Sequence, residues 1–178
     1  MEAGIDSFKV EGRTKSLYYV SAVAKAYREA IDKVYADPQA DMQPYFEELL
    51  KVGNRGYTTG FYLGEGYPKD GYSHDISKGL AGADFLCEIC GKEDDWYRIR
   101  IKNKFFKNED IEIITPSEKY ATQVTEIKTL KGEELELANT NDDLWVKFAK
   151  APLEYEYALA RTIGIKGGLN ETQNCACS

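Results

Sequence analysis

The stretch Tyr97-Arg98-Ile99-Arg100-Ile101-Lys102 alternates apolar and basic side chains. Successive side chains of a strand point to opposite faces of a sheet, so this pattern predicts a strand with one buried and one solvated face. Further segments of this kind, separated by turn-prone residues, lie at 85–89, 111–113, 122–128, 133–138, 144–148 and 159–165. Short strands at this spacing predict an antiparallel barrel or sandwich of six or seven strands between about residues 75 and 165.

The N-terminal third has a helical period instead. After Ser16, a suitable N-cap, apolar residues recur in steps of three and four, which predicts a helix ending near Asp37-Pro38. A second helix is predicted from about Pro44 to Val52, and a short strand over Gly4–Val10. The fold class is therefore α+β. The first helix is expected to bury Leu17, Val20, Ala24, Tyr27, Ile31 and Val34.

Composition limits the kind of protein. A chain of 178 residues with 43% hydrophobic content can bury one core, or one small domain plus a helical appendage. The formal net charge of −7 gives no bulk attraction to phosphate backbones or anionic lipid. The apolar runs are far shorter than a membrane span. We therefore expect a cytoplasmic protein with no membrane partner.

Three blocks of sequence resemble peptidase family U32, the collagenase-like peptidases. They are Gly4–Ser16 with Tyr19-Val20 and Ala26–Ala30, then Asn54–Phe61, then Lys102–Phe105 with Asp110–Ile113 and Thr115-Pro116. The resemblance covers about residues 3 to 150. It implies a (β/α) barrel-like catalytic domain followed by a small antiparallel β-barrel similar to the second domain of elongation factor Tu.

Under this resemblance the chain is expected to be the C-terminal piece of a longer protein. Residues 1–52 would be a strand and helices left from the catalytic domain, 53–74 a connecting loop, 75–165 the barrel and 166–178 a flexible tail. The family's peptidase signature, and the cysteines that hold an iron–sulfur cluster in some relatives, would lie upstream. No cofactor is therefore expected in this chain itself.

The resemblance leaves two activities open. Relatives have been called proteases or collagenases, whereas others resemble oxygen-independent hydroxylases acting on tRNA, ribosomal RNA or ubiquinone. The chain would be an accessory β-barrel module of a collagenase-like peptidase that positions substrate or RNA for the upstream catalytic domain. The alternatives are that the parent is an iron–sulfur-dependent RNA hydroxylation protein, or that the chain has an independent activity, either proteolysis or metal binding. Expected partners are that upstream domain, tRNA or rRNA bound weakly, and a second copy bound through the exposed helix face.

Two groups of residues are candidates for substrate binding. Glu11 and Arg13 follow the predicted strand, and the loop after a strand lines the active site of a (β/α) barrel. There an arginine can bind a carboxylate or phosphate, and a glutamate can orient it or move a proton; alternatively the pair only fixes the loop. The second group lies among glycines, which allow the backbone to approach a ligand closely. Alternatively, this loop packs the barrel onto the catalytic domain. The second group comprises Asn54, Arg55, Thr58 and Thr59.

The cysteines are candidate ligands of a metal site. Cys87 and Cys90, together with Cys175 and Cys177, would complete a four-sulfur zinc site if the tail folds back. Strand alternation instead points Cys87 and Cys90 to opposite faces, so that the four are unrelated thiols. Because His74 is the only histidine, no Ser-His-Asp or Cys-His arrangement can be built without it. It is expected in an exposed turn.

One basic cluster is a candidate nucleic-acid surface, centred on Arg98, Arg100 and Lys102. Cations can follow phosphates while aromatic rings stack on bases. The alternative is an ordinary solvated strand face, weakened as an RNA site by the adjacent acidic residues 93–95. The other members of the cluster are Lys104, Lys107, Trp96, Tyr97, Phe105 and Phe106.

Overall fold

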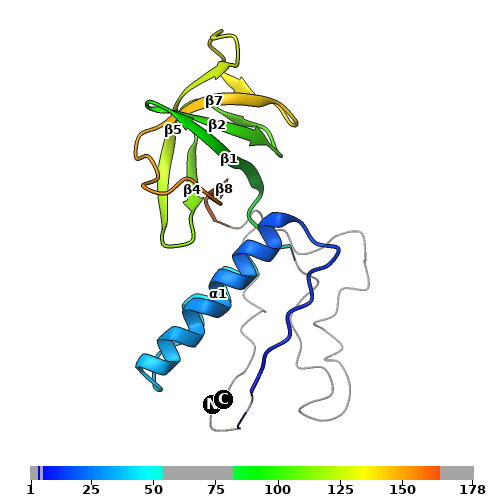
Figure 1. Ribbon diagram of the computed structural model, residues 1–178, viewed down its shortest axis with the longest axis vertical. Coiled ribbons are helices and arrows are strands. Elements are labelled where there is room, and N and C mark those ends of the chain that lie inside the picture. Colours follow the sequence, from blue (N-terminus) through cyan, green and yellow to red (C-terminus); the bar gives the residue numbers. More distant parts are fainter. Residues whose placement is uncertain (1–3, 5, 54–81, 165–178) are drawn as a thin grey trace. The chain divides into compact units, whose positions relative to one another are not determined.

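The computed structural model describes residues 4, 6–53 and 82–164 (Figure 1). The chain divides into two compact units, Met1–Leu49 and Leu50–Ser178. The predicted connecting loop lies outside the described residues except for Gly53, and the predicted tail lies wholly outside them. The boundaries of these two segments therefore stay predictions.

Both predicted helices are present. α1 spans Leu17–Ala36, and the Ser16 hydroxyl accepts a hydrogen bond from the backbone N–H of Tyr19 at 3.2 Å, which caps the helix as expected. α2 spans Gln43–Leu50, and none of its residues is fully buried. Neither helix is long and apolar enough to cross a membrane, and no other helix in the described residues is either.

The buried face of α1 differs from the predicted one. The buried residues are Tyr18, Ala22, Val23 and Ala26, whereas Leu17 and Val20 are 53% and 47% exposed. At about 100° per residue, the true face is rotated by roughly 150° about the helix axis from the predicted one. The prediction gave weight to large apolar side chains, but alanines allow closer packing and here form half of the buried face.

The strand predicted over Gly4–Val10 is not formed. The described residues of this stretch belong to no strand, and Phe8 and Val10 are exposed. An extended segment becomes a strand only when its backbone groups pair with a neighbouring strand. None of the described strands pairs with these residues.

The second unit is a closed antiparallel β-barrel (Figure 1). Its strands follow the order β1-β2-β7-β5-β4-β8, and β8 pairs back to β1. Closure removes the sheet edges that would otherwise expose unpaired backbone groups. The bounds are β1 Phe85–Glu93, β2 Trp96–Ile101, β4 Asp110–Ile114, β5 Lys119–Thr129, β7 Asp143–Phe148 and β8 Leu159–Thr162.

Two short strands form a separate two-stranded sheet that is not part of the barrel wall. β3 (Phe105–Phe106) and β6 (Leu137–Ala138) are antiparallel to each other. The longer strand predicted over 133–138 is thus reduced to its last two residues, apart from an isolated bridge between Lys128 and Glu134.

The barrel interior is filled by apolar side chains, as expected for a barrel of few strands. In β2, Tyr97, Ile99 and Ile101 are buried while Arg98 and Arg100 are exposed, so the predicted alternation is confirmed. Strands β1, β4, β5 and β7 supply many of the other core residues, including Leu86, Ile111, Ile113, Val124, Ile127 and Val146. Because the interior is packed, binding has to use the outside of the barrel.

The segment that follows α2 is bound to the start of the barrel. The backbone N–H of Ala83 donates to the carbonyl of Lys51 at 2.7 Å, and Val52 is fully buried. A Cβ atom on Gly82 would lie only 2.2 Å from the Lys51 carbonyl oxygen. Glycine is therefore needed at position 82 for this close approach.

Candidate functional site

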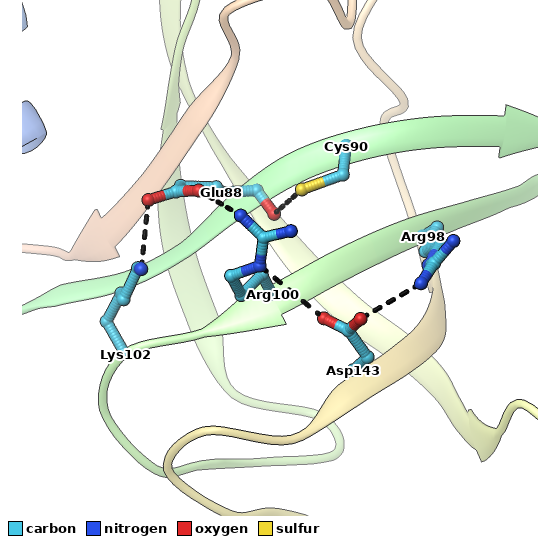
Figure 2. A network of polar contacts seen from close by, with 6 residues as sticks. All are labelled: Glu88, Cys90, Arg98, Arg100, Lys102 and Asp143. Atoms are coloured by element: carbon cyan, nitrogen blue, oxygen red, sulfur yellow. Dashed lines mark hydrogen bonds and ion pairs between the residues drawn. The ribbon is translucent and has the colours of Figure 1, made fainter.

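The predicted cations of β2 lie together on the outside of the barrel. Figure 2 shows Arg98, Arg100 and Lys102 beside Glu88 of β1 and Asp143 of β7. Pairing of β2 with both β1 and β7 brings the five side chains together, because Arg100 lies opposite Glu88 on one side and Asp143 on the other.

Arg100 lies between the two carboxylates of this group. Its Nη1 is 3.4 Å from Glu88 Oε2, and its Nε is 3.8 Å from Asp143 Oδ1. Arg98 Nη2 binds Asp143 Oδ2 at 2.9 Å, and Lys102 Nζ binds Glu88 Oε1 at 3.1 Å. Ion pairs between exposed side chains contribute only about 0–1 kcal/mol each. A phosphate can therefore replace a carboxylate as partner at little cost.

The rest of the predicted cluster separates in space. Tyr97 and Phe105 are buried in the core, so their rings cannot stack on a base. Lys107 binds Glu136 of the segment before β6 at 2.9 Å, and this hydrogen bond raises the pKa of the lysine. Lys104 and Phe106 are exposed, but they lie at or before β3, which pairs with β6 in a separate sheet. We therefore take the part of the cluster on the outer side of β2 as the candidate surface.

Closure of the barrel extends this surface with residues that the sequence analysis did not single out. Trp145 of β7 lies opposite Arg98 of β2 on one side and opposite Lys128 of β5 on the other. Lys128 and Lys147 also place their Nζ atoms 3.6 and 4.6 Å from the centroid of the Trp96 ring. No local motif signals these contacts, because they join strands that are distant in the chain.

The other predicted substrate-binding residues are not assembled by the described part of the chain. Glu11 and Arg13 are exposed in the segment before α1, where Glu11 Oε1 accepts a hydrogen bond from the backbone N–H of Arg13 at 3.0 Å. Asn54, Arg55, Thr58 and Thr59 lie outside the described residues, and so does His74. The roles predicted for these residues stay predictions.

Cys87 and Cys90 point to opposite sides of the barrel wall, as strand alternation predicted. Cys87 is buried in the core, and burial raises the pKa of its thiol well above the usual range. Cys90 is exposed, and its thiol donates to the carbonyl of Glu88 at 3.7 Å. Within residues 4, 6–53 and 82–164, no group of three His, Cys, Asp or Glu could hold a metal ion. Cys175 and Cys177 lie outside those ranges, so the four-sulfur site stays a prediction.

A buried ion pair lies elsewhere in the barrel wall. The guanidinium of Arg161 in β8 is fully buried and donates to Glu112 Oε2 of β4 through Nε at 2.6 Å. Lys51 Nζ lies 3.9 Å from the same carboxylate oxygen. This cluster fastens the segment after α2 to the barrel, and we assign it a structural role.

Comparison with known proteins identifies relatives of two kinds. A tRNA hydroxylation protein P of Escherichia coli (strain K12) is 32% identical over 161 residues, which are 88% of this chain and 34% of that protein. A collagenase of Porphyromonas gingivalis is 40% identical over 68 residues, 36% of this chain and 19% of that protein. The chain thus spans about a third of the length of the Escherichia coli protein.

A solved structure and two family models are also similar to parts of this chain. The C-terminal domain of a U32 peptidase from Geobacillus thermoleovorans has a TM-score of 0.40 at 21% identity, covering 44% of this chain and 99% of that chain. Residues 1–71 match the model of peptidase family U32, and residues 82–161 match that of the family's C-terminal domain. Both units of this chain therefore belong to peptidase family U32.

Proposed function

We propose that this chain serves a tRNA-hydroxylating member of family U32, in which the barrel is an accessory module that holds tRNA for the catalytic part of the protein. The supporting similarity to a tRNA hydroxylation protein runs through both units, whereas the similarity to the collagenase covers 68 residues. In this proposal the protein acts in the cytoplasm.

The observation that carries the proposal is the state of the β2 cations. The side chains of Arg98 and Arg100 are about half exposed, at 47% and 54%, and their partners Asp143 and Glu88 are 34% and 17% exposed. These ion pairs hold the guanidinium groups in place while leaving them able to exchange a carboxylate for a phosphate. An ion pair with a purely structural role does not need a guanidinium that a phosphate can reach. The guanidinium of Arg161, which binds Glu112, is fully buried.

The chemistry of hydroxylation is assigned to the catalytic part of the parent protein. An iron–sulfur cluster is proposed for that part, as the resemblance to the family implies. The barrel's contribution is binding and orientation, which lower a reaction barrier by fixing the reacting groups relative to each other.

The test is a titration of labelled tRNA against the 178-residue chain at two salt concentrations. The double variant Arg98→Glu, Arg100→Glu should bind at least about tenfold more weakly than wild type, because two phosphate contacts become repulsive. Binding by wild type should also fall as salt rises. The matched control, Lys119→Glu with Lys131→Glu, makes the same change in net charge at other exposed positions of the barrel.

Equal affinity of the Arg98/Arg100 variant and wild type would contradict the proposal. So would an equal loss of affinity in the control, since the effect would then come from net charge alone.

The second candidate function is peptide hydrolysis, favoured by the 40% identity to a collagenase over 68 residues. It predicts turnover of gelatin or casein by the purified chain, whereas our proposal expects none. Activity that persists through repeated purification would favour this alternative.

A further inference from the structure

We infer that the outer face of β2, β7 and β5 binds an unpaired segment of RNA, with the Trp145 ring stacked on a base and with Arg98 and Lys128 on its two sides contacting phosphates. This inference rests on the proposed function and narrows it, because it names the form of RNA and the stacking residue.

The strand register places Trp145 at the centre of this face. β7 lies between β2 and β5 in the barrel, so Trp145 has Arg98 as its neighbour across one strand pair and Lys128 across the other. Trp145 is partly exposed, while Leu144 and Val146 on either side of it are buried. Its side chain therefore stands on the outside of the wall, between two cations from neighbouring strands.

Lys128 is held in place without being neutralised. Its Nζ lies 3.6 Å from the centroid of the Trp96 ring, and among the described residues it makes no ion pair with a carboxylate. Lys147 also approaches Trp96, at 4.6 Å, but binds Glu126 at 3.0 Å. An indole ring attracts a cation through its negative face and leaves the full positive charge available. Trp96 thus acts as a positioning residue for Lys128.

The charge of the face differs in sign from that of the chain. The strands of the face carry five cations and three carboxylates, a local net charge of +2, and Glu134, the bridge partner of Lys128, lowers it to +1, whereas the formal net charge of the chain is −7. Each of the three strand carboxylates is bound by a cation of the same face. The five cations are Arg98, Arg100, Lys102, Lys128 and Lys147, and the strand carboxylates are Glu88, Glu126 and Asp143.

A partly exposed aromatic ring flanked by cations fits a nucleic acid better than an acidic peptide. Carboxylates of a peptide would bind the cations but leave the tryptophan without a planar partner, whereas every base presents a π-face. In a duplex the faces of the bases are covered by their neighbours. The ring therefore selects unpaired nucleotides, such as those in a loop.

The experiment uses the two tryptophans of the chain as reporters. Trp96→Phe leaves Trp145 as the sole indole, and Trp145→Phe leaves Trp96. Each full-length variant is titrated with an unpaired RNA oligonucleotide and with the same sequence as a duplex. We expect the unpaired RNA to quench the fluorescence of Trp145 strongly, and the duplex to quench it little, because stacking requires contact with a base face.

Affinity is measured separately with Trp145→Leu. Loss of one stacked base should weaken binding of unpaired RNA about tenfold. The matched control is Tyr157→Leu, which removes an exposed aromatic ring from the segment before β8 of the same unit and should leave affinity unchanged. Circular dichroism checks that each variant is folded; if Trp145→Leu does not fold, the quenching of Trp145 in the Trp96→Phe variant decides.

The outcomes separate this inference from the proposed function. If wild type binds neither tRNA nor the oligonucleotide, or binds denatured collagen peptides instead, the proposed function fails and this inference falls with it. If wild type binds RNA but Trp145 is not quenched, or if duplex binds as well as unpaired RNA, only the stacking inference is overturned. Binding that depends on Trp145 and prefers unpaired RNA supports both.

Discussion

Glu112 neutralises a buried charge in the barrel wall. Its carboxylate binds the guanidinium of Arg161, which is fully buried. Breaking a buried ion pair by removing one charge costs about 3–5 kcal/mol, because the other charge stays in a medium that solvates it poorly. We therefore expect Glu112→Gln to lower the free energy of unfolding by about 3 kcal/mol or more, measured by urea denaturation.

The matched control for this substitution is Glu126→Gln. Glu126 binds Lys147 at a similar distance, 3.0 Å, but both side chains are substantially exposed. The control should change stability by less than about 1 kcal/mol. Similar losses in the two variants would show that burial of Arg161 is not the cause.

Because of Tyr120, we expect the free energy of unfolding to fall as pH rises through the alkaline range. Its hydroxyl is buried with no hydrogen-bond partner among the described residues, and burial raises the pKa of Tyr120 to about 12. The native state therefore holds this proton more tightly than the unfolded chain, where a tyrosine titrates near pH 10. Stability from this group is intact below about pH 10 and is lost as pH rises toward 12.

Tyr120→Phe tests this dependence. The variant should be as stable as wild type or more so at pH 7, because it no longer buries a hydroxyl without a partner. Between pH 10 and 12 it should lose less stability than wild type. Tyr157→Phe, at a tyrosine that is 84% exposed, is the control and should follow the wild-type curve. Identical pH profiles for all three proteins would refute the role of Tyr120.

At the scale of elements, the contact between the segment after α2 and the start of the barrel depends on a glycine. A methyl group on Gly82 would meet the Lys51 carbonyl oxygen at 2.2 Å, and that oxygen belongs to the backbone and cannot turn aside. Gly82→Ala should therefore destabilise the barrel unit by about 1–3 kcal/mol, the usual cost of overpacking. Chemical denaturation followed by tryptophan fluorescence measures the loss.

Gly53→Ala is the control for this joint. A Cβ atom at Gly53 would have no heavy atom within 4 Å, so the same chemical change meets open space there. Its stability should match wild type or rise slightly through a less flexible unfolded chain. If both variants lose the same stability, the close approach at Gly82 does not explain the effect.

At the scale of the whole molecule, the two units should respond separately to a change in the barrel core. Both tryptophans lie in barrel strands, so fluorescence reports the barrel, while α1 dominates the helical circular dichroism signal. Ile99 is fully buried in the core, and Ile99→Ala should cost the barrel about 2–5 kcal/mol. The fluorescence transition should move to lower denaturant, with the helical transition unchanged. Movement of both transitions together would show that the units unfold as one.

Local sequence pattern was enough to predict the elements in which apolar and polar residues follow a regular period. The cap at Ser16 and the bounds of α1 follow from a side-chain hydrogen bond and a helical period, both of which act within a few residues. The inward and outward sides of β2 follow from the pleat in the same way. By contrast, the strand predicted over Gly4–Val10 has no pairing partner among the described strands, and local pattern cannot supply one.

The sequence by itself determined the class of the fold, the alternation that exposes Arg98 and Arg100, and the resemblance to family U32. Only the tertiary structure decided that β7 lies between β2 and β5, which places Trp145 between Arg98 and Lys128. It also decided that Arg161 is buried against Glu112 and that α1 buries its alanine-containing face. Side-chain period is a property of neighbouring residues, whereas barrel closure and helix packing depend on contacts between residues far apart in the chain, which no local pattern encodes.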